Sequence, residues 1–187
     1  MNITIISGSP RIGSLTHRVA LNLQNEFAEK TGHTIHLISL QDHSLPAMQQ
    51  VWSSFDNTPE SFKGLSEIIF KTDAFILVSP EYNGSYAPAM KNLLDHFPKQ
   101  HHKPFGIVTA SPGAFGGLRA AIQMQQLVTA LFGTVSPYML IAPGVEKKFD
   151  ENGQLHDPAF QGSIDQFVYE FLWLSEKLVK ATELVLA

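Results

Sequence analysis

The chain has 187 residues and a formal net charge of −4, and 44% of its residues are hydrophobic and 16% are charged. This length and composition predict one globular domain, residues 1–187, that buries its own core, and the charge excludes a general attraction to nucleic acid or anionic lipid. The chain has no cysteine, which excludes disulfides, thiolate nucleophiles and cysteine-bound metal, so any redox chemistry must come from a cofactor.

The first third of the chain alternates between strand and helix. Asn2 to Ile6 is a short β-branched run typical of a buried strand. Because it has neither a basic flank nor the length of a membrane span, we expect a cytoplasmic protein that does not bind membranes. Helical spacing of apolar residues predicts a helix over Ser14 to Lys30, which ends before Gly32. Thr34 to Leu40 alternates and predicts a strand, whereas the polar, proline-containing Gln41 to Pro59 predicts a long loop.

The rest of the chain continues this alternation and ends in a long helix. Apolar periodicity predicts strands over Ala74 to Val78, Pro104 to Ala110 and Thr134 to Ile141, and helices over Glu60 to Thr72, Pro88 to Phe97, Leu118 to Phe132 and Phe160 to Leu186, with a loop over Ala142 to Pro158. A helical stripe predicts the face of the last helix that packs on the core: Phe167, Phe171, Leu174, Leu178 and Val185.

Strands that alternate with helices favour right-handed crossovers onto a parallel sheet. Five such strands match the doubly wound α/β order 2-1-3-4-5, with helices on both faces. In sheets of this kind, ligands bind beyond the carboxyl ends of the strands. We therefore expect the chemistry in the loops that follow the first, third and fourth strands.

The first of these loops, Ser7 to Thr16, reads SGSPRIGSLT. The N–H groups at a helix start favour a phosphate, the hydroxyls can donate to its oxygens, and Arg11 can supply charge-assisted hydrogen bonds. The loop matches neither GxxxxGK[ST] nor GxGxxG, which weighs against ATP or a dinucleotide. The alternative is that Ser14 only caps the helix and that the preceding residues only turn the chain.

The other two loops offer groups that suit a flat heterocycle. Ser79 to Pro88 supplies backbone amides, a phenol ring and a carboxamide, which an isoalloxazine ring could use. The alternative is a turn with Tyr82 in the core. Ser111 to Gly117 is rich in glycine, which permits close approach of a ligand, or serves only as a flexible connection.

Three sequence segments together resemble the NADPH-dependent FMN reductase family. They are Ser9-Pro10-Arg11-Ile12-Gly13-Ser14, Pro80-Glu81-Tyr82-Asn83 and Lys91-Asn92-Leu93-Leu94-Asp95, and Ser111 with Gly116-Gly117 completes the likeness, which spans Ile3 to about Phe132. The resemblance implies a flavodoxin-like three-layer fold with FMN as cofactor and NADPH or NADH as electron donor. It also implies a small-molecule electron acceptor, such as a flavin, quinone, azo compound or chromate, and a homodimer or homotetramer.

The same resemblance implies a set of FMN-binding residues and no catalytic side chain, and the scattered histidines do not have the convergent spacing of a metal site. The phosphate loop is matched by Ser9, Arg11, Gly13, Ser14 and Thr16, where many relatives have asparagine in place of Thr16. The segment along the isoalloxazine is matched by Pro80, Glu81, Tyr82, Asn83 and Gly84, and the loop near its pyrimidine edge by Ser111, Gly113, Gly116 and Gly117.

Other functions fit parts of the sequence. A flavodoxin-like electron carrier and an FMN-binding sensor remain alternatives, although the modest acidity of the chain is unlike the strongly acidic docking face of such carriers. A hydrolase built from Ser79, Asp95 and His96 lacks the GxSxG elbow. Arg11 and Arg119 are candidates for contact with a 2′-phosphate by position. The loop Gln41 to Pro59, with Trp52 and Phe55, and the helix from Pro88 to Phe97 serve either an oligomer interface or a cover for the site.

Overall fold

A parallel sheet forms the frame of the computed structural model, which describes the backbone of residues 1–186 and the side chains of residues 1–181. The strands β1 (Asn2–Ser7), β2 (Thr34–Ser39), β3 (Ala74–Ser79) and β6 (Pro104–Ser111) lie side by side in the order β2-β1-β3-β6. Two short strands, β7 (Thr134–Val135) and β8 (Leu140–Pro143), pair with the free edge of β6, and every pairing in this sheet is parallel. This confirms the predicted flavodoxin-like order 2-1-3-4-5.

The fifth position of the sheet holds two strands rather than the single strand predicted over Thr134 to Ile141. Val135 pairs with Phe105, but the next pair is Leu140 with Val108, so the outer chain takes more residues than β6 over the same stretch and bulges outward. Pro137 lies in this bulge. Because proline has no N–H to donate, it interrupts the ladder.

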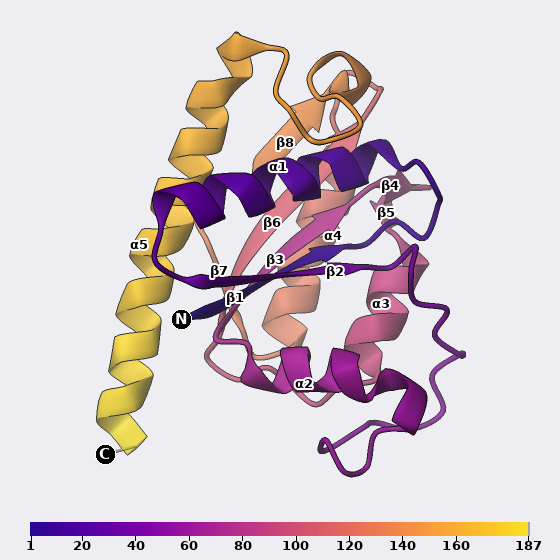
Figure 1. Ribbon diagram of the computed structural model, residues 1–187, viewed down its shortest axis with the longest axis vertical. Coiled ribbons are helices and arrows are strands. Elements are labelled where there is room, and N and C mark those ends of the chain that lie inside the picture. The colour runs from indigo at the N-terminus through magenta and orange to yellow at the C-terminus, as the bar shows by residue number, and fades with distance from the viewer. Residues whose placement is uncertain (187) are drawn as a thin grey trace.

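Helices cover both faces of the sheet (Figure 1). The helices α1 (Leu15–Lys30) and α5 (Gln161–Leu186) pack on one face, and α2 (Lys63–Lys71), α3 (Pro88–Asp95) and α4 (Leu118–Ala130) pack on the other. Short 3-10 turns are η1 (Glu60–Phe62), which opens the predicted 60–72 helix, η2 (Val145–Lys147) and η3 (Pro158–Phe160). Within the described residues, no helix is long and apolar enough to cross a membrane.

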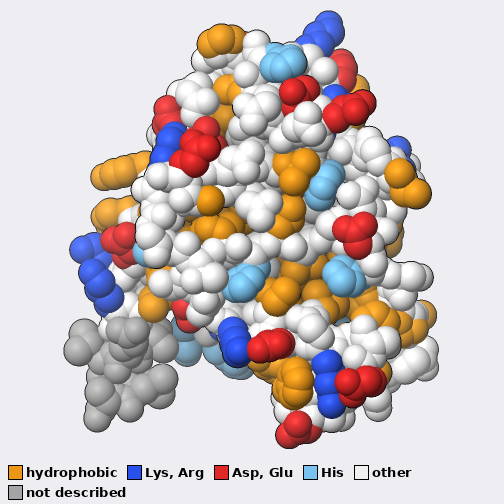
Figure 2. All heavy atoms as spheres, in the orientation of Figure 1, with side chains coloured by type: hydrophobic (Ala, Val, Ile, Leu, Met, Phe, Trp, Pro, Cys, Tyr) orange, Lys and Arg blue, Asp and Glu red, His pale blue; other side chains and the backbone are white. Residues whose placement is uncertain are grey.

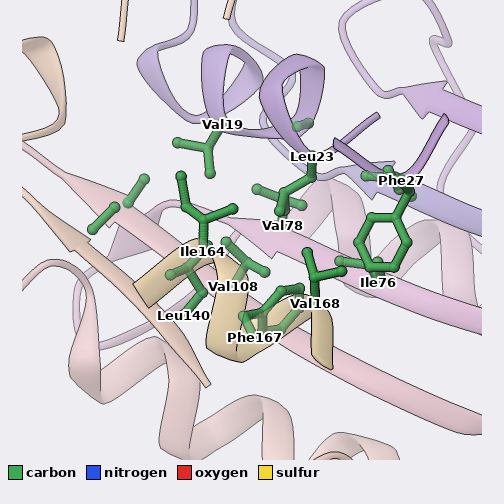
Figure 3. Close-up of a cluster of buried hydrophobic side chains, with 14 of the residues drawn as sticks. Val19, Leu23, Phe27, Ile76, Val78, Val108, Leu140, Ile164, Phe167 and Val168 are labelled. Atoms are coloured by element: carbon green, nitrogen blue, oxygen red, sulfur yellow. The ribbon is translucent and has the colours of Figure 1, made fainter. Parts of the chain in front are cut away.

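The core follows the period-two alternation of the central strand. Ile76 and Val78 of β3 face α1 and α5, whereas Phe75 and Leu77 face the other helical layer. Figure 3 shows the first cluster, in which side chains of α1 and α5 meet over β3, β6 and β8: Val19, Leu23, Phe27, Ile76, Val78, Val108, Leu140, Ile164, Phe167 and Val168. Of the predicted α5 stripe, Phe167 and Phe171 are fully buried and Leu174 and Leu178 half-buried, while Val185 lies outside the described side chains.

The loop that leaves β3 is a β-hairpin, which the loop prediction missed. Strands β4 (Glu81–Tyr82) and β5 (Ser85–Tyr86) pair antiparallel. The turn between them has φ of 50° at Asn83 and 84° at Gly84. Two positive φ values in a two-residue turn are typical of type I′, for which Asn-Gly is the preferred sequence. The hairpin therefore gives the PEYN segment a fixed shape.

The long segment 41–59 is docked along α3. Trp52 is only 2% exposed, and its ring centroid lies 5.1 Å from that of Phe62 and 4.3 Å from that of His96. The Asn92 side chain donates to the carbonyl of Pro46 at 2.8 Å and accepts from the N–H of Met48 at 3.1 Å. Trp52 thus belongs to the core of this chain, so it is not free to cover a site or to meet a second subunit.

Candidate cofactor site

Three loops that follow β1, β3 and β6 emerge at one edge of the sheet. We call them loop one (residues 8–14), loop two (80–87) and loop three (112–117). Because β3 lies between β1 and β6 and all three strands are parallel, the predicted site residues reach the same edge. The N–H of Gly8 donates to the carbonyl of Val78 at 2.8 Å, which ties the start of loop one to the end of β3.

Ser14 stands at the start of α1 with an unused hydroxyl. It occupies the N-cap position, yet its side chain makes no capping hydrogen bond. Its side chain is buried, with the residue 5% exposed, and its Oγ has no hydrogen-bond partner among the described residues. A buried hydroxyl without a partner costs about 1–3 kcal/mol. The capping alternative is therefore excluded, and the position suits a ligand that approaches the first amides of α1.

The other predicted residues of loop one surround this position. Ser9 is 1% exposed and Thr16 is 2% exposed, and the Oγ of Ser9 accepts a long hydrogen bond of 3.4 Å from the N–H of Arg11. Gly13 has φ of 67° and faces open space. Arg11 is exposed, and its guanidinium carbon lies 5.4 Å from the centroid of the Tyr82 ring, so loop one contacts loop two.

Tyr82 of the hairpin in loop two lies on the side that faces loop one. The ring is half-buried, and its hydroxyl is buried without a hydrogen-bond partner among the described residues. The ends of the loop are held by Ser79, whose Oγ accepts from the N–H of Ala87 at 2.9 Å and donates to the carbonyl of Pro80 at 2.9 Å. Because these bonds occupy the Ser79 hydroxyl, it is not available as a nucleophile.

Loop three brings the start of α4 against the sheet. Gly117 is the N-cap of α4 with φ of 90°, and a Cβ built there would lie 2.9 Å from that of Thr109. A Cβ on Gly116 would meet β8 at Ile141, and Ser111 donates to the carbonyl of Gly113 at 3.3 Å. Thr109 is a residue that the sequence prediction missed: its Oγ1 is buried and unpartnered within the described part of the chain.

His17 is a second residue that sequence reasoning missed. Its Nδ1 lies 3.0 Å from the Oγ of Ser7, and it lines a cavity of about 260 Å³ together with Gly13, Ser14 and Arg18. Burial lowers the pKa of His17, and the negative charge of Asp42 opposes this only in part. The imidazole is therefore neutral at pH 7. In the sequence, only the position of His17 in the first turn of the predicted helix indicated that it lies near the site.

The arrangement fits a flat cofactor that carries one phosphate. Ser14 and the first amides of α1 offer donors without competing acidic side chains in the first turn, which suits a phosphate dianion. The hairpin and loop three offer main-chain groups and the Tyr82 ring beside them, which suits a heterocycle. FMN has both parts, so the residues present fit it.

Comparison with known proteins by sequence gives both a family and individual relatives. The model of a family described as NADPH-dependent FMN reductase matches residues 1–145. An FMN-dependent NADPH-azoreductase of Staphylococcus aureus is 30% identical over 165 residues, which cover 84% of this chain and 86% of that protein. A quinone reductase of Pseudomonas putida is 28% identical over 177 residues, covering 89% of this chain and 92% of that protein.

A solved structure supports the fold in the same way. FerB, a flavoenzyme NAD(P)H:(acceptor) oxidoreductase from Paracoccus denitrificans, superposes with a TM-score of 0.78 at 24% sequence identity. The match covers 94% of this chain and 97% of the FerB chain. The two proteins therefore share the whole three-layer arrangement.

Proposed function

Because this chain belongs to the NADPH-dependent FMN reductase family, we propose that it passes electrons from NADPH or NADH to a flat, oxidising small molecule such as a flavin, quinone or azo compound. The family match makes it an NAD(P)H-dependent FMN oxidoreductase. Bound FMN supplies the hydride and electron transfer. The chain's own residues bind, orient and tune, and none of them acts as a nucleophile.

The observation that carries this proposal is the free, buried hydroxyl of Ser14 at the start of α1. It would donate to the cofactor phosphate together with the first amides of the helix, and Arg11 would add a positive charge at the exposed side of the loop. The full set proposed to hold the phosphate is Ser9, Arg11, Gly13, Ser14 and Thr16.

The ring of the cofactor would lie along loop two and loop three. We assign the residues beside its plane as Pro80, Glu81, Tyr82, Asn83 and Gly84, and those near its pyrimidine edge as Ser111, Gly113, Gly116 and Gly117. Amides at the start of α4 would stabilise negative charge that develops on the ring. An arrangement of fixed main-chain donors needs little reorganisation during turnover.

Exposed apolar side chains at the rim support both the class of acceptor and an oligomer. Ile12 of loop one is 95% exposed and Phe115 of loop three is 81% exposed, and Leu118 and Ile122 extend this surface along α4. Such a rim suits flat, poorly soluble oxidants and a second copy of the chain. We propose a homodimer or homotetramer in the cytoplasm, where NADPH is available, and light scattering of the purified protein measures the assembly.

The charge pattern of the face shown in Figure 2, together with the modest net charge of −4, favours a reductase over a carrier that docks to protein partners. Figure 2 shows acidic and basic side chains interspersed on one face of the molecule, with no single acidic field across it. Carriers that are steered to their partners need a surface dominated by one sign of charge.

Visible spectra of the FMN-loaded protein test the proposal. We expect the flavin band to bleach when NADPH is added without oxygen and to recover when a quinone is added. Retained flavin that neither NADPH nor NADH bleaches would instead support the carrier or the sensor. Failure to retain FMN at all would refute the assignment of the three loops.

A further inference from the structure

The carboxylate of Glu81, near the start of loop two, is held by contacts within the chain itself. Its Oε1 accepts from Arg119 Nε at 2.6 Å and lies 2.5 Å from Arg119 Nη2, and its Oε2 accepts from the backbone N–H of Arg119 at 3.2 Å. The Glu81 side chain is 11% exposed and that of Arg119 is 76% exposed. A shielded carboxylate with this set of partners has little capacity left for a ligand.

Glu81 also takes the place of the missing cap on α4. The helix starts after Gly117, which has no side chain to cap it, and there is no acidic residue in its first turn. The first four N–H groups of a helix lack partners within the helix, and a carboxylate there is favourable. Glu81 provides one from 38 positions earlier in the chain. A Cβ at Gly117 would lie 3.7 Å from that of Glu81, an ordinary van der Waals distance, so the side chain of Glu81 lies directly beside the start of α4.

Tyr82, the next residue of β4, joins the opposite face of the hairpin to loop one. Successive side chains of a strand point to opposite faces, so Tyr82 points away from α4 and lies under the guanidinium of Arg11. Two consecutive residues of β4 thus join loop two to α4 and to loop one.

We propose that Glu81 is a positioning residue that acts through Arg119 and the first turn of α4. Its side chain fixes loop two relative to loop three and is not a ligand of the flavin, so any contact of residue 81 with the ring comes from its main chain. This inference rests on the proposed function to the extent that these two loops hold FMN. The ion pair itself does not depend on the cofactor.

A double-mutant cycle on FMN affinity tests the proposal. Glu81→Gln and Arg119→Met should each raise the dissociation constant of FMN about tenfold, because small displacements of a binding loop have effects of this order. The double variant should bind no more weakly than the weaker single variant, since Arg119→Met breaks the side-chain ion pair that Glu81→Gln also breaks. Arg119→Lys, which keeps the charge, should recover part of the affinity. Glu67→Gln breaks an exposed ion pair with Lys71 in α2 and should leave the affinity unchanged.

The pattern of the cycle separates positioning from direct binding. If Glu81 contacted the flavin, Glu81→Gln would weaken binding by the same factor in the Arg119→Met background as in wild type, so the two effects would multiply in full. That result, or wild-type affinity in Glu81→Gln, would overturn the proposal. Because the Arg119 side chain is mostly exposed, Arg119→Met is expected to fold even if Glu81→Gln does not. In that case the FMN affinity of Arg119→Met, and the partial recovery of this affinity in Arg119→Lys, decide the test.

Hydrogen exchange of the apoprotein provides a readout that needs no cofactor. The backbone N–H of Arg119 should exchange faster in Glu81→Ala, which has no side-chain acceptor, than in wild type, whereas in Arg119→Met the carboxylate still accepts from this N–H and the change should be smaller. Equal exchange in all three proteins would contradict the cap. If wild type failed to bind FMN, the proposed function would fall, and this measurement would still decide whether Glu81 holds α4.

Discussion

Replacing Ser14 with alanine should separate the stability of the apoprotein from its affinity for FMN. Because the Ser14 hydroxyl is buried without a partner among the described residues, its loss should leave the free energy of unfolding of the apoprotein unchanged or raise it by up to about 1 kcal/mol. A hydrogen bond to a charged phosphate contributes about 1.5–3 kcal/mol. We therefore expect the dissociation constant of FMN to rise roughly 10- to 100-fold.

Thermal unfolding with and without FMN measures both effects. At an FMN concentration of about 100 times the wild-type dissociation constant, binding stabilises the protein by about 2.7 kcal/mol, and a tenfold weaker site leaves about 1.4 kcal/mol. For a chain of this length the difference corresponds to a loss of about 3–5 °C from the FMN-induced rise in Tm.

Ser66 provides the matched control. It is also fully buried, but its Oγ is 2.9 Å from the Oγ1 of Thr58 and the two hydroxyls share a hydrogen bond. Ser66→Ala should therefore lower the stability of the apoprotein by about 1–3 kcal/mol and leave the FMN-induced rise in Tm intact. If Ser14→Ala behaved like Ser66→Ala, Ser14 would be an ordinary structural serine and the phosphate assignment would be refuted.

Three further outcomes follow from the structure. Burial lowers the pKa of His17 from its ordinary 6.5, so the unfolded chain binds more protons and stability should fall as pH drops through 6.5 toward the folded pKa; urea midpoints across this range should change less in His17→Gln. Gly117→Ala puts a Cβ 2.9 Å from a neighbouring side chain at φ of 90° and should cost about 2–4 kcal/mol in denaturant unfolding, whereas Gly144→Ala, which has φ of 59° and open space, should cost about 1–2 kcal/mol. Asn92→Ala removes both hydrogen bonds to the segment 46–48 and should speed its cleavage in limited proteolysis.

The layers of the fold could be predicted because burial leaves a local record in the sequence. A strand covered on both faces, such as β3, is apolar from Ala74 to Val78, and each helix carries a stripe at helical spacing. The break in the strand predicted over Thr134 to Ile141 could also be predicted, since Pro137 has no N–H to donate to a sheet. The hairpin could be predicted as well, because Asn83-Gly84 is a common sequence for a two-residue turn.

The convergence of the three loops could also be predicted, since parallel strands end at one edge of a sheet. The contacts that shape the site could not. Glu81 and Arg119 are 38 positions apart, and no pattern in the sequence pairs them. Trp52 lies in a polar segment, and only its ring contacts with His96 and Phe97, just after α3, show that it is buried. Whether Ser14 caps its helix depends on a side-chain orientation that composition does not determine.

The residues that carry the resemblance fall into two groups, those that already shape the apoprotein and those whose side chains have no role in it. Asn83 and Gly84 form the hairpin turn, Gly117 lets the start of α4 lie close to Thr109 of β6, and Glu81 caps α4. The Ser14 hydroxyl is buried at the same edge of the sheet with no hydrogen-bond partner among the described residues. Changes to the first group should lower apoprotein stability and FMN affinity together, whereas Ser14→Ala should lower affinity alone. A plot of the change in FMN affinity against the change in apoprotein stability would separate the two groups. Variants of residues that build the site should follow one trend, whereas a variant of a binding residue should lose affinity without losing stability.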